Sequence, residues 1–282
     1  SPLISWKEIF HKDAWKRLFS SRFSSRKKNS IHACNPENEG KLMRVEGLSK
    51  TYQGYKVVKA LEDVNFTINQ NEVIVVIGPN GAGKSTLINI LAGAIEPTEG
   101  TLYLYDGEPT KRFKEIQQFL GVCFQDNVIL KLLSIKEHFE LFGAFKNIPK
   151  KELEETMYFF AETLQLMDML KTRAGDLSGG QKRKLCISLS LLGNPPLVIM
   201  DEPTAGVDVQ ARQLIWKVIA SLEHTTTIVT SHALEEAEAV SSRLFVVAAG
   251  KLPFAGTSTE FRKQFQCGYI LRIDTSKPNE EE

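Results

Sequence analysis

A glycine-rich loop constrains the fold of this 282-residue chain more than any other feature. Residues 78–85 fit the pattern G-x-x-x-x-G-K-[ST], after a predicted strand at residues 72–77 that is uniformly apolar from Val73 on, and before a helical pattern at residues 84–92. In that setting the glycines let backbone N–H groups cradle phosphate oxygens at the positive end of a helix. Lys84 is expected to reach the β- and γ-phosphates, and the Ser85 hydroxyl to hold Mg²⁺. The predicted nucleotide-binding residues of this loop are Gly78, Pro79, Asn80, Gly81, Ala82, Gly83, Lys84, Ser85 and Thr86.

Short β-rich runs alternate with helical patterns on both sides of the loop. Strands are predicted at residues 42–48, 64–68, 72–77, 101–105, 120–124, 197–200, 226–230 and 244–248, and helices at residues 84–92, 150–166, 182–192, 209–223 and 234–240. Such alternation is typical of a largely parallel sheet with helices on both faces. A mostly helical stretch at about residues 128–192, with a capping box at Ser134 and Glu137, predicts an inserted helical subdomain.

Composition excludes several classes of protein. The chain is 42% hydrophobic and 24% charged, which is ordinary for a globular protein with a sizeable core. Its longest apolar run is six residues, whereas a membrane-spanning helix needs roughly 20. The four cysteines are scattered and include no C-x-x-C pair, which argues against a disulfide scaffold or a zinc site and fits a reducing compartment. The net charge of +1 gives the body no basic face for nucleic acid.

Two further segments contain residues suited to phosphate chemistry. Residues 197–200 are apolar and lead into Asp201 and Glu202. An aspartate at the end of a buried strand beside the phosphate loop is suited to Mg²⁺, and Glu202 to accepting a proton from an attacking water. The second segment precedes the helical run 182–192 and combines a helix-capping serine with two small residues that allow close approach to exposed N–H groups. Its residues are Ser178, Gly179, Gly180 and Gln181.

The phosphate loop, Leu-Ser-Gly-Gly-Gln at residues 177–181 and Met-Asp-Glu-Pro-Thr at residues 200–204, in this order, resemble the nucleotide-binding domain of an ATP-binding cassette (ABC) protein. The resemblance spans about residues 41–256. It implies a RecA-like P-loop core with a largely parallel sheet, an antiparallel β portion near the adenine and the helical subdomain. It also implies that two such domains sandwich two ATP molecules, each Ser-Gly-Gly segment closing the other domain's phosphate loop.

The same resemblance implies roles for single residues. Tyr52 would stack on adenine, Gln125 would touch Mg²⁺ and the attacking water, and His232 would contact the γ-phosphate. Asp201 would be the Mg²⁺ ligand together with Ser85 and Gln125, and Glu202 the catalytic base. The expected catalytic set is therefore Lys84, Gln125, Glu202 and His232, with Asp208 in a loop that communicates across the dimer.

Within that family, residues 121–127, 180–185 and 206–208 and the ending at residues 267–269 are similar to the eukaryotic A subfamily, which is associated with lipid transport. Pro79 and Phe124 depart from this likeness, because the subfamily usually has His and Pro at those positions.

The N-terminal 30 residues carry eight basic and two acidic side chains, a net charge of +6, so the remainder sums to −5. Together with aromatic residues, these charges fit an amphipathic helix on a membrane surface, a juxtamembrane segment or a solvated tail. We expect this arm and a linker over residues 1–40, the ABC domain over 41–266 and a C-terminal strand and acidic tail over 267–282. The opening Ser-Pro in place of Met suggests a piece of a longer protein.

The sequence thus predicts an ATP-hydrolysing domain that powers transport, with lipid as a candidate substrate, through membrane segments that are not in this chain. The cofactors would be ATP and Mg²⁺. The partners would be transmembrane domains of the same transporter and a second ABC domain, at the cytoplasmic face of a membrane. Two alternatives remain: a soluble ABC ATPase acting on ribosomes or DNA, and a regulatory domain that binds ATP without hydrolysing it.

Overall fold

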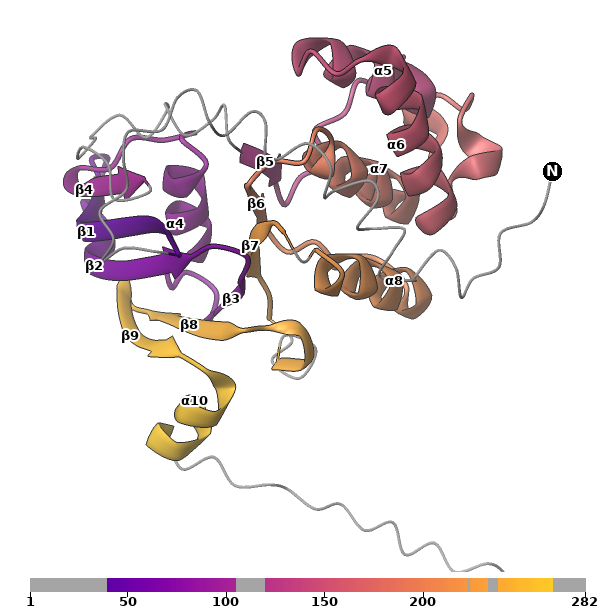
Figure 1. The fold of residues 1–282 in the computed structure, drawn as a ribbon. Coiled ribbons are helices and arrows are strands. Elements are labelled where there is room, and N and C mark those ends of the chain that lie inside the picture. The colour runs from indigo at the N-terminus through magenta and orange to yellow at the C-terminus, as the bar shows by residue number, and fades with distance from the viewer. Residues whose placement is uncertain (1–39, 105–119, 223, 233–237, 266–282) are drawn as a thin grey trace, which may run out of the picture.

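The computed structural model describes residues 40–104, 120–222, 224–232 and 238–265. The predicted N-terminal arm (apart from residue 40), the C-terminal tail and most of the predicted helix 234–240 lie outside these ranges. Within the described ranges, no helix has both the length and the apolar character needed to cross a membrane. The predicted α/β fold is confirmed: a mostly parallel sheet lies between a small antiparallel sheet and a group of helices (Figure 1).

The larger sheet has six strands in the order β5-β6-β7-β3-β8-β9. All neighbours are parallel except β8 and β9. The strands are β3 (Val73–Ile77), β5 (Leu120–Cys123), β6 (Leu197–Met200), β7 (Thr226–Thr230), β8 (Arg243–Ala248) and β9 (Lys251–Gly256). Because the parallel strands point the same way, the loops that follow β3, β5, β6 and β7 meet at one edge of the sheet, here called the carboxyl edge.

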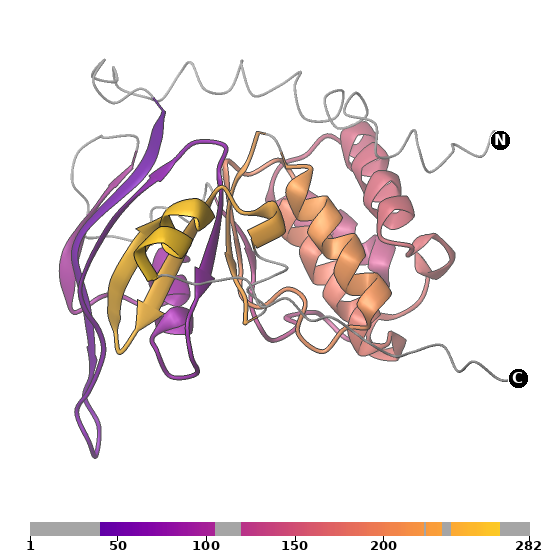
Figure 2. The ribbon, with the colours of Figure 1, turned by 90° about the horizontal axis from the view of Figure 1, so that it is seen from below.

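Helices and the second sheet cover the two faces of the parallel sheet. Residues Val73 and Val75 of β3 join one hydrophobic core, which includes α7 (Gly179–Leu191) and α8 (Val209–Ala220). Ile74 and Val76 join the other core, which includes α4 (Lys84–Leu91) and the antiparallel strands. Figure 2 shows the antiparallel strands and α4 on one side of the parallel sheet, and the helices of residues 135–220 on the other. Burial on both faces explains why the strands of the parallel sheet are almost uniformly apolar.

The antiparallel sheet has the order β2-β1-β4. Its strands are β1 (Lys41–Tyr52), β2 (Val58–Asn69) and β4 (Glu99–Leu104). The first two are longer than the predicted runs at residues 42–48 and 64–68, because β1 and β2 continue as a hairpin with exposed side chains near its tip. The apolar pattern marked only the part of each strand that packs on the core.

Helices α5 (Ile135–Phe145) and α6 (Lys150–Thr163) and the short helices η4 (Met167–Met169) and η5 (Ala174–Asp176) occupy the predicted helical insertion. The capping box is present: Ser134 accepts a hydrogen bond from the amide of Glu137, whose carboxylate accepts one from the amide of Ser134. The helix predicted at residues 182–192 begins three residues earlier, at Gly179, so both glycines of the Ser-Gly-Gly segment lie in its first turn. Strand β9 and helix α10 (Ser258–Phe265) were not predicted.

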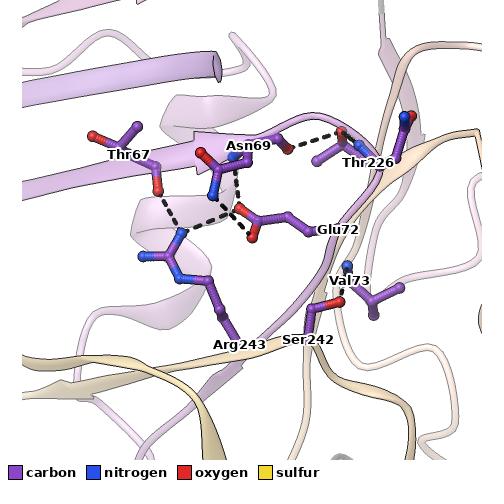
Figure 3. Close-up of polar contacts among 8 residues, drawn as sticks. Thr67, Asn69, Glu72, Val73, Thr226, Ser242 and Arg243 are labelled. Atoms are coloured by element: carbon purple, nitrogen blue, oxygen red, sulfur yellow. Dashed lines mark hydrogen bonds and ion pairs between the residues drawn. The ribbon is translucent and has the colours of Figure 1, made fainter. Parts of the chain in front are cut away.

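The opposite edge of the parallel sheet, here called the amino edge, is fixed by a charged pair (Figure 3). The buried carboxylate of Glu72 accepts hydrogen bonds from the Asn69 amide at 2.6 Å and from Arg243 at 3.2 Å. Arg243 also donates to the carbonyl of Thr67 at 2.9 Å, and Thr226 donates to the carbonyl of Asn69 at 3.2 Å. These contacts join the end of β2 to the starts of β3, β7 and β8, so they hold the two sheets together.

Candidate nucleotide and hydrolysis site

The phosphate loop follows β3 at the carboxyl edge and cannot tolerate side chains at two of its glycines. A Cβ atom at Gly78 would lie 2.1 Å from the carbonyl oxygen of Val247 in β8, and one at Gly83 would lie 2.5 Å from that of Ala60 in β2. Gly83 also has a φ of +110°, which L-residues rarely adopt. The loop is therefore clamped between both sheets, and its shape is imposed by the fold.

The turn between β8 and β9 adds a second clamp on this loop. The amide of Gly250 donates to the carbonyl of Ala82 at 2.9 Å, and the carbonyl of Gly250 accepts from the amide of Glu62 at 2.8 Å. One residue of the turn thus bridges the phosphate loop and the antiparallel sheet. This support was not predicted, because β9 itself was not.

The side chain of Lys84, near the end of the phosphate loop, reaches back to the carbonyl groups at its start. It donates to the carbonyls of Gly78 at 2.7 Å and Pro79 at 3.1 Å, and the side chain is almost entirely buried. Burial lowers the pKa of Lys84, while the negative charges of Glu202 and Asp201 act in the opposite direction. The two carboxylates that were predicted to share the site are thus close enough to Lys84 to act on its charge.

Asp201 and Glu202 follow β6 and are held by one residue of the neighbouring strand β7. The hydroxyl of Thr230 donates to Oδ1 of Asp201 at 2.5 Å and accepts from the amide of Glu202 at 2.8 Å. Glu202 has a φ of +47°, a conformation that is costly for a residue with a Cβ atom and needs support from its surroundings. The role of Thr230 was missed by sequence reasoning, although its place two residues before His232 at the end of a buried strand is visible in the sequence.

His232 meets Glu202 directly. The Nε2 atom of His232 lies 2.6 Å from Oε1 of Glu202, and 45% of the histidine side chain is exposed against 17% of the glutamate. The two predicted catalytic side chains therefore come from the ends of β7 and β6 and share one contact, with the histidine on the open side.

Two other predicted residues, Gln125 and Tyr52, have no recorded side-chain contact with this centre. Gln125 follows β5 and is exposed, and its carbonyl accepts a hydrogen bond from Arg183. Tyr52 ends β1, and its partner in register, Val58, is two residues from the Ala60 that touches Gly83. Their side-chain roles stay predictions.

Asp208 has a structural task in this chain. It is the N-cap of α8 and accepts a hydrogen bond from the Ala211 amide at 2.8 Å. That bond lowers the pKa of Asp208 below its usual value. A role across a dimer would come in addition to capping.

The predicted Mg²⁺ donors have the right chemistry. Ser85 is exposed in the first turn of α4, and Asp201 offers a carboxylate at the carboxyl edge. Mg²⁺ prefers such oxygen ligands and keeps several positions for phosphate and water. Among the described residues, no group of three or more His, Cys, Asp or Glu side chains is placed to hold a metal ion. Ser85 and Asp201 offer oxygen donors of the kind that Mg²⁺ prefers.

The Ser-Gly-Gly segment forms the start of α7 as a second capping box. Ser178 accepts from the amide of Gln181 at 3.3 Å, and its own amide donates to the Gln181 side chain at 2.8 Å. A Cβ atom at Gly179 would meet nothing within 4 Å, and one at Gly180 only a methyl group of Val207 at 4.0 Å. In contrast to Gly78 and Gly83, these two glycines are not required by the packing of this chain.

Comparison with known proteins decides the family. The family model described as "ABC transporter" matches residues 61–205, about half of the chain. The chain belongs to the ABC transporter family. As a domain of this family it binds ATP and is an ATPase, as the phosphate loop and the adjoining carboxylates predicted.

Curated relatives of this ABC domain include "Cholesterol transporter ABCA5" of Rattus norvegicus, 37% identical over 76% of this chain, and of Homo sapiens, 35% identical over 88%. "ABC transporter A family member 5" of Dictyostelium discoideum is 34% identical over 80% of the chain. The predicted likeness to the A subfamily is confirmed. The chain spans only 13–16% of the length of these relatives.

Solved structures of ABC domains share the fold. "Dimeric Structure of MJ0796, a Bacterial ABC Transporter Cassette" has a TM-score of 0.70 at 26% identity and covers 77% of this chain and 98% of its own. "Structure of ATP binding subunit of ABC transporter" has a TM-score of 0.72 at 26% identity and covers 80% of this chain and 93% of its own.

Proposed function

We propose that this ABC domain hydrolyses ATP to power a membrane transporter, and that it works as one of two such domains that close around two ATP molecules. The observation that carries the proposal is the convergence of Lys84, Asp201 and Glu202 at the carboxyl edge, with His232 on Glu202. A cation for phosphate, an oxygen donor for a metal and a general base are the groups that phosphoryl transfer to water requires.

In the proposed reaction the Lys84 amine exchanges the carbonyls of Gly78 and Pro79 for phosphate oxygens. Glu202 orients a water and accepts its proton as the water oxygen bonds to the γ-phosphorus. The bond from that phosphorus to the β–γ bridging oxygen then breaks, and ADP and phosphate leave. His232 holds the Glu202 carboxylate at 2.6 Å, which fixes the direction of the base. Mg²⁺, held by Ser85, Asp201 and Gln125 when bound, would neutralise charge on the phosphates.

Pairing of two domains is supported by the two glycines of the Ser-Gly-Gly segment. Glycine near a helix start costs roughly 1 kcal/mol relative to alanine, and nothing within this chain crowds either Cβ position. A ligand that approaches the backbone from outside explains their presence. The nucleotide on a second domain is such a ligand, because the start of α7 presents N–H groups suited to phosphate oxygens.

Transmembrane partners are supported by an exposed apolar stretch that follows Gln125. Val128, Leu130 and Leu132 are exposed by 68%, 52% and 79%. Large apolar side chains gathered on one surface are typical of contact with another protein. We therefore propose that this stretch contacts membrane segments of the same transporter, with the domain at the cytoplasmic face of a membrane. The printed names of the relatives are those of transporters, which favours this function over a soluble ABC ATPase acting on ribosomes or DNA.

A lipid is the proposed cargo, because two of these relatives are named "Cholesterol transporter ABCA5". The test is the ATPase rate of the full-length transporter in liposomes with and without cholesterol. We expect cholesterol to raise the rate, and an unchanged rate across a series of lipids would contradict a lipid cargo.

The hydrolytic role is tested with Glu202→Gln. We expect ATP binding within about threefold of the unmodified chain and a fall in turnover of at least about 100-fold, the size expected for loss of a general base. Glu140→Gln, which alters an exposed carboxylate on α5, is the control and should change neither. The rate per molecule of the unmodified chain should rise with protein concentration if pairing completes the site. Undiminished hydrolysis by Glu202→Gln would show that the base is another group.

A further inference from the structure

A buried arginine links the start of α7 to the hydrolytic centre of the same domain. Arg183 is 2% exposed, although arginine is almost never fully buried without partners. All four of its recorded hydrogen bonds end on backbone carbonyls, at 2.5–3.0 Å. The acceptors are the carbonyl oxygens of Phe124, Gln125, Asp201 and Pro203.

These acceptors surround the groups that act on the nucleotide. Asp201 and Pro203 stand on either side of Glu202, so Arg183 fixes the backbone of the proposed base from both directions. Gln125 is the proposed contact to the attacking water, and its carbonyl is bonded to the same guanidinium. Arg183 itself lies in the second turn of α7, three residues after Gly180 of the Ser-Gly-Gly segment.

We propose that Arg183 is a positioning residue that couples the two nucleotide sites of the paired domains. When a nucleotide rearranges Gln125 or Glu202, the carbonyls beside them move, and the guanidinium transmits this movement to residues 178–181. Those residues contact the nucleotide on the other domain. This inference rests on the proposed function, because it requires a second domain that receives the segment.

The shape of arginine is what allows this coupling. Its planar guanidinium offers five donors in a fixed fork, so one side chain can hold carbonyls from two separate segments, residues 124–125 and 201–203, together. Lysine keeps the charge but offers its three donors from a single point. Arg183→Lys therefore preserves the charge and loses the simultaneous link, which separates positioning from electrostatics.

The chain offers a matched control at the amino edge. Arg243 also donates to a backbone carbonyl, that of Thr67, and is partly buried beside Glu72. It joins the two sheets at the amino edge (Figure 3), whereas the phosphate loop follows the opposite end of β3. Arg243→Lys makes the same chemical change at a site whose hydrogen bonds go to Thr67 and Glu72 and to none of the proposed nucleotide-binding residues.

The experiment measures hydrolysis against ATP concentration, together with binding of a fluorescent ATP analogue to the dilute protein and the melting temperature. We expect the unmodified chain to show a Hill coefficient above 1. Arg183→Lys should lower kcat at least tenfold and bring the Hill coefficient to 1, with binding to the dilute protein within twofold. Arg243→Lys should lower the melting temperature and leave the Hill coefficient unchanged. A Hill coefficient in Arg183→Lys equal to that of the cooperative unmodified chain would overturn the inference.

A second measurement on the unmodified chain does not depend on the folding of any variant. Amide hydrogen exchange at residues 178–181 is followed in dilute protein with and without Mg-ATP. The inference expects protection of this segment to change on binding, and an unaltered exchange pattern overturns it. An unmodified chain whose rate per molecule is independent of protein concentration overturns the pairing of domains, and the coupling with it. The two failures are thus distinguishable.

Discussion

Replacing Thr230 by valine should separate the support of the hydrolytic centre from the binding of nucleotide. Thr230 is fully buried, and its single hydroxyl serves Asp201 as a donor and the Glu202 amide as an acceptor. Valine has nearly the same shape, so the variant removes the two hydrogen bonds and leaves the packing of β7 in place.

The magnitude follows from the groups left behind. A buried amide or carboxylate that loses its partner costs about 1–3 kcal/mol, so we expect a loss of about 3 kcal/mol in the free energy of unfolding. For a domain of this size each kcal/mol lowers the melting temperature by roughly 2–4 °C, which gives a fall of roughly 6–12 °C. Relaxation of the Glu202 backbone from its φ of +47° moves the base. Since a misplacement of about 1 Å can cost a factor of about 100, kcat should fall by about 10–100-fold, with nucleotide affinity within about threefold.

Two control variants separate the loss of the Thr230 hydroxyl from a general effect of substitution in β7. Thr230→Ser retains the hydroxyl and should recover most of the lost rate. Thr227 lies on the same strand, and its buried hydroxyl finds no hydrogen-bond partner among the residues that the structure describes. Thr227→Val should therefore leave the melting temperature unchanged or raise it. Thermal denaturation, steady-state hydrolysis and nucleotide binding are measured on all three. A valine variant at position 230 that hydrolyses ATP at the normal rate, or a serine variant equally impaired, would refute the reasoning.

Three more outcomes are expected. Gly83→Ala should destabilise the domain by several kcal/mol in urea unfolding and abolish nucleotide binding, because its Cβ would lie 2.5 Å from the carbonyl oxygen of Ala60. Gly179→Ala should leave stability unchanged or higher yet reduce hydrolysis, and unreduced hydrolysis would contradict a close approach from outside. Burial lowers the pKa of Lys146, which donates to the carbonyl of Leu192, to about 8. Because the unfolded lysine holds its proton up to about pH 10.5, stability should rise between about pH 8 and 10.5, by at most about 3 kcal/mol. The Lys146→Met variant should lack this rise in urea unfolding, and an identical slope would contradict the assignment.

The sequence was sufficient for the parts of the fold that depend on local pattern. Residues 197–200 and 226–230 are uninterrupted runs of apolar or β-branched residues that are buried on both faces of the sheet. Both strands have the predicted bounds. Strand β9 was missed because it is half exposed and contains Pro253, which disfavours a strand assignment, and because its pairing with β8 depends on tertiary structure. The phosphate loop was predictable because glycine spacing directly encodes its backbone.

The supporting residues of the site were not predictable in the same way. Arg183 bonds to carbonyls of segments 18–59 residues away, and a carbonyl leaves no trace in the residue type that carries it. The one available signal was a cation within a helix whose neighbours Leu185 and Cys186 are apolar, since such a helix must bury some of its charges. Thr230 offered less, because threonine is common in strands for its shape alone.

Charge serves different purposes at the two edges of the parallel sheet. At the amino edge, Glu72 and Arg243 bond to each other and to backbone groups of the strands they join, so a substitution there acts on stability. At the carboxyl edge, Lys84 bonds to carbonyls of its own loop and Glu202 to a half-exposed His232. Both partners at that edge can be exchanged for phosphate or water without breaking the contacts between strands. Binding can therefore rearrange the carboxyl edge while the amino edge keeps the sheets in place, and paired measurements of melting temperature and turnover should separate variants of the two edges.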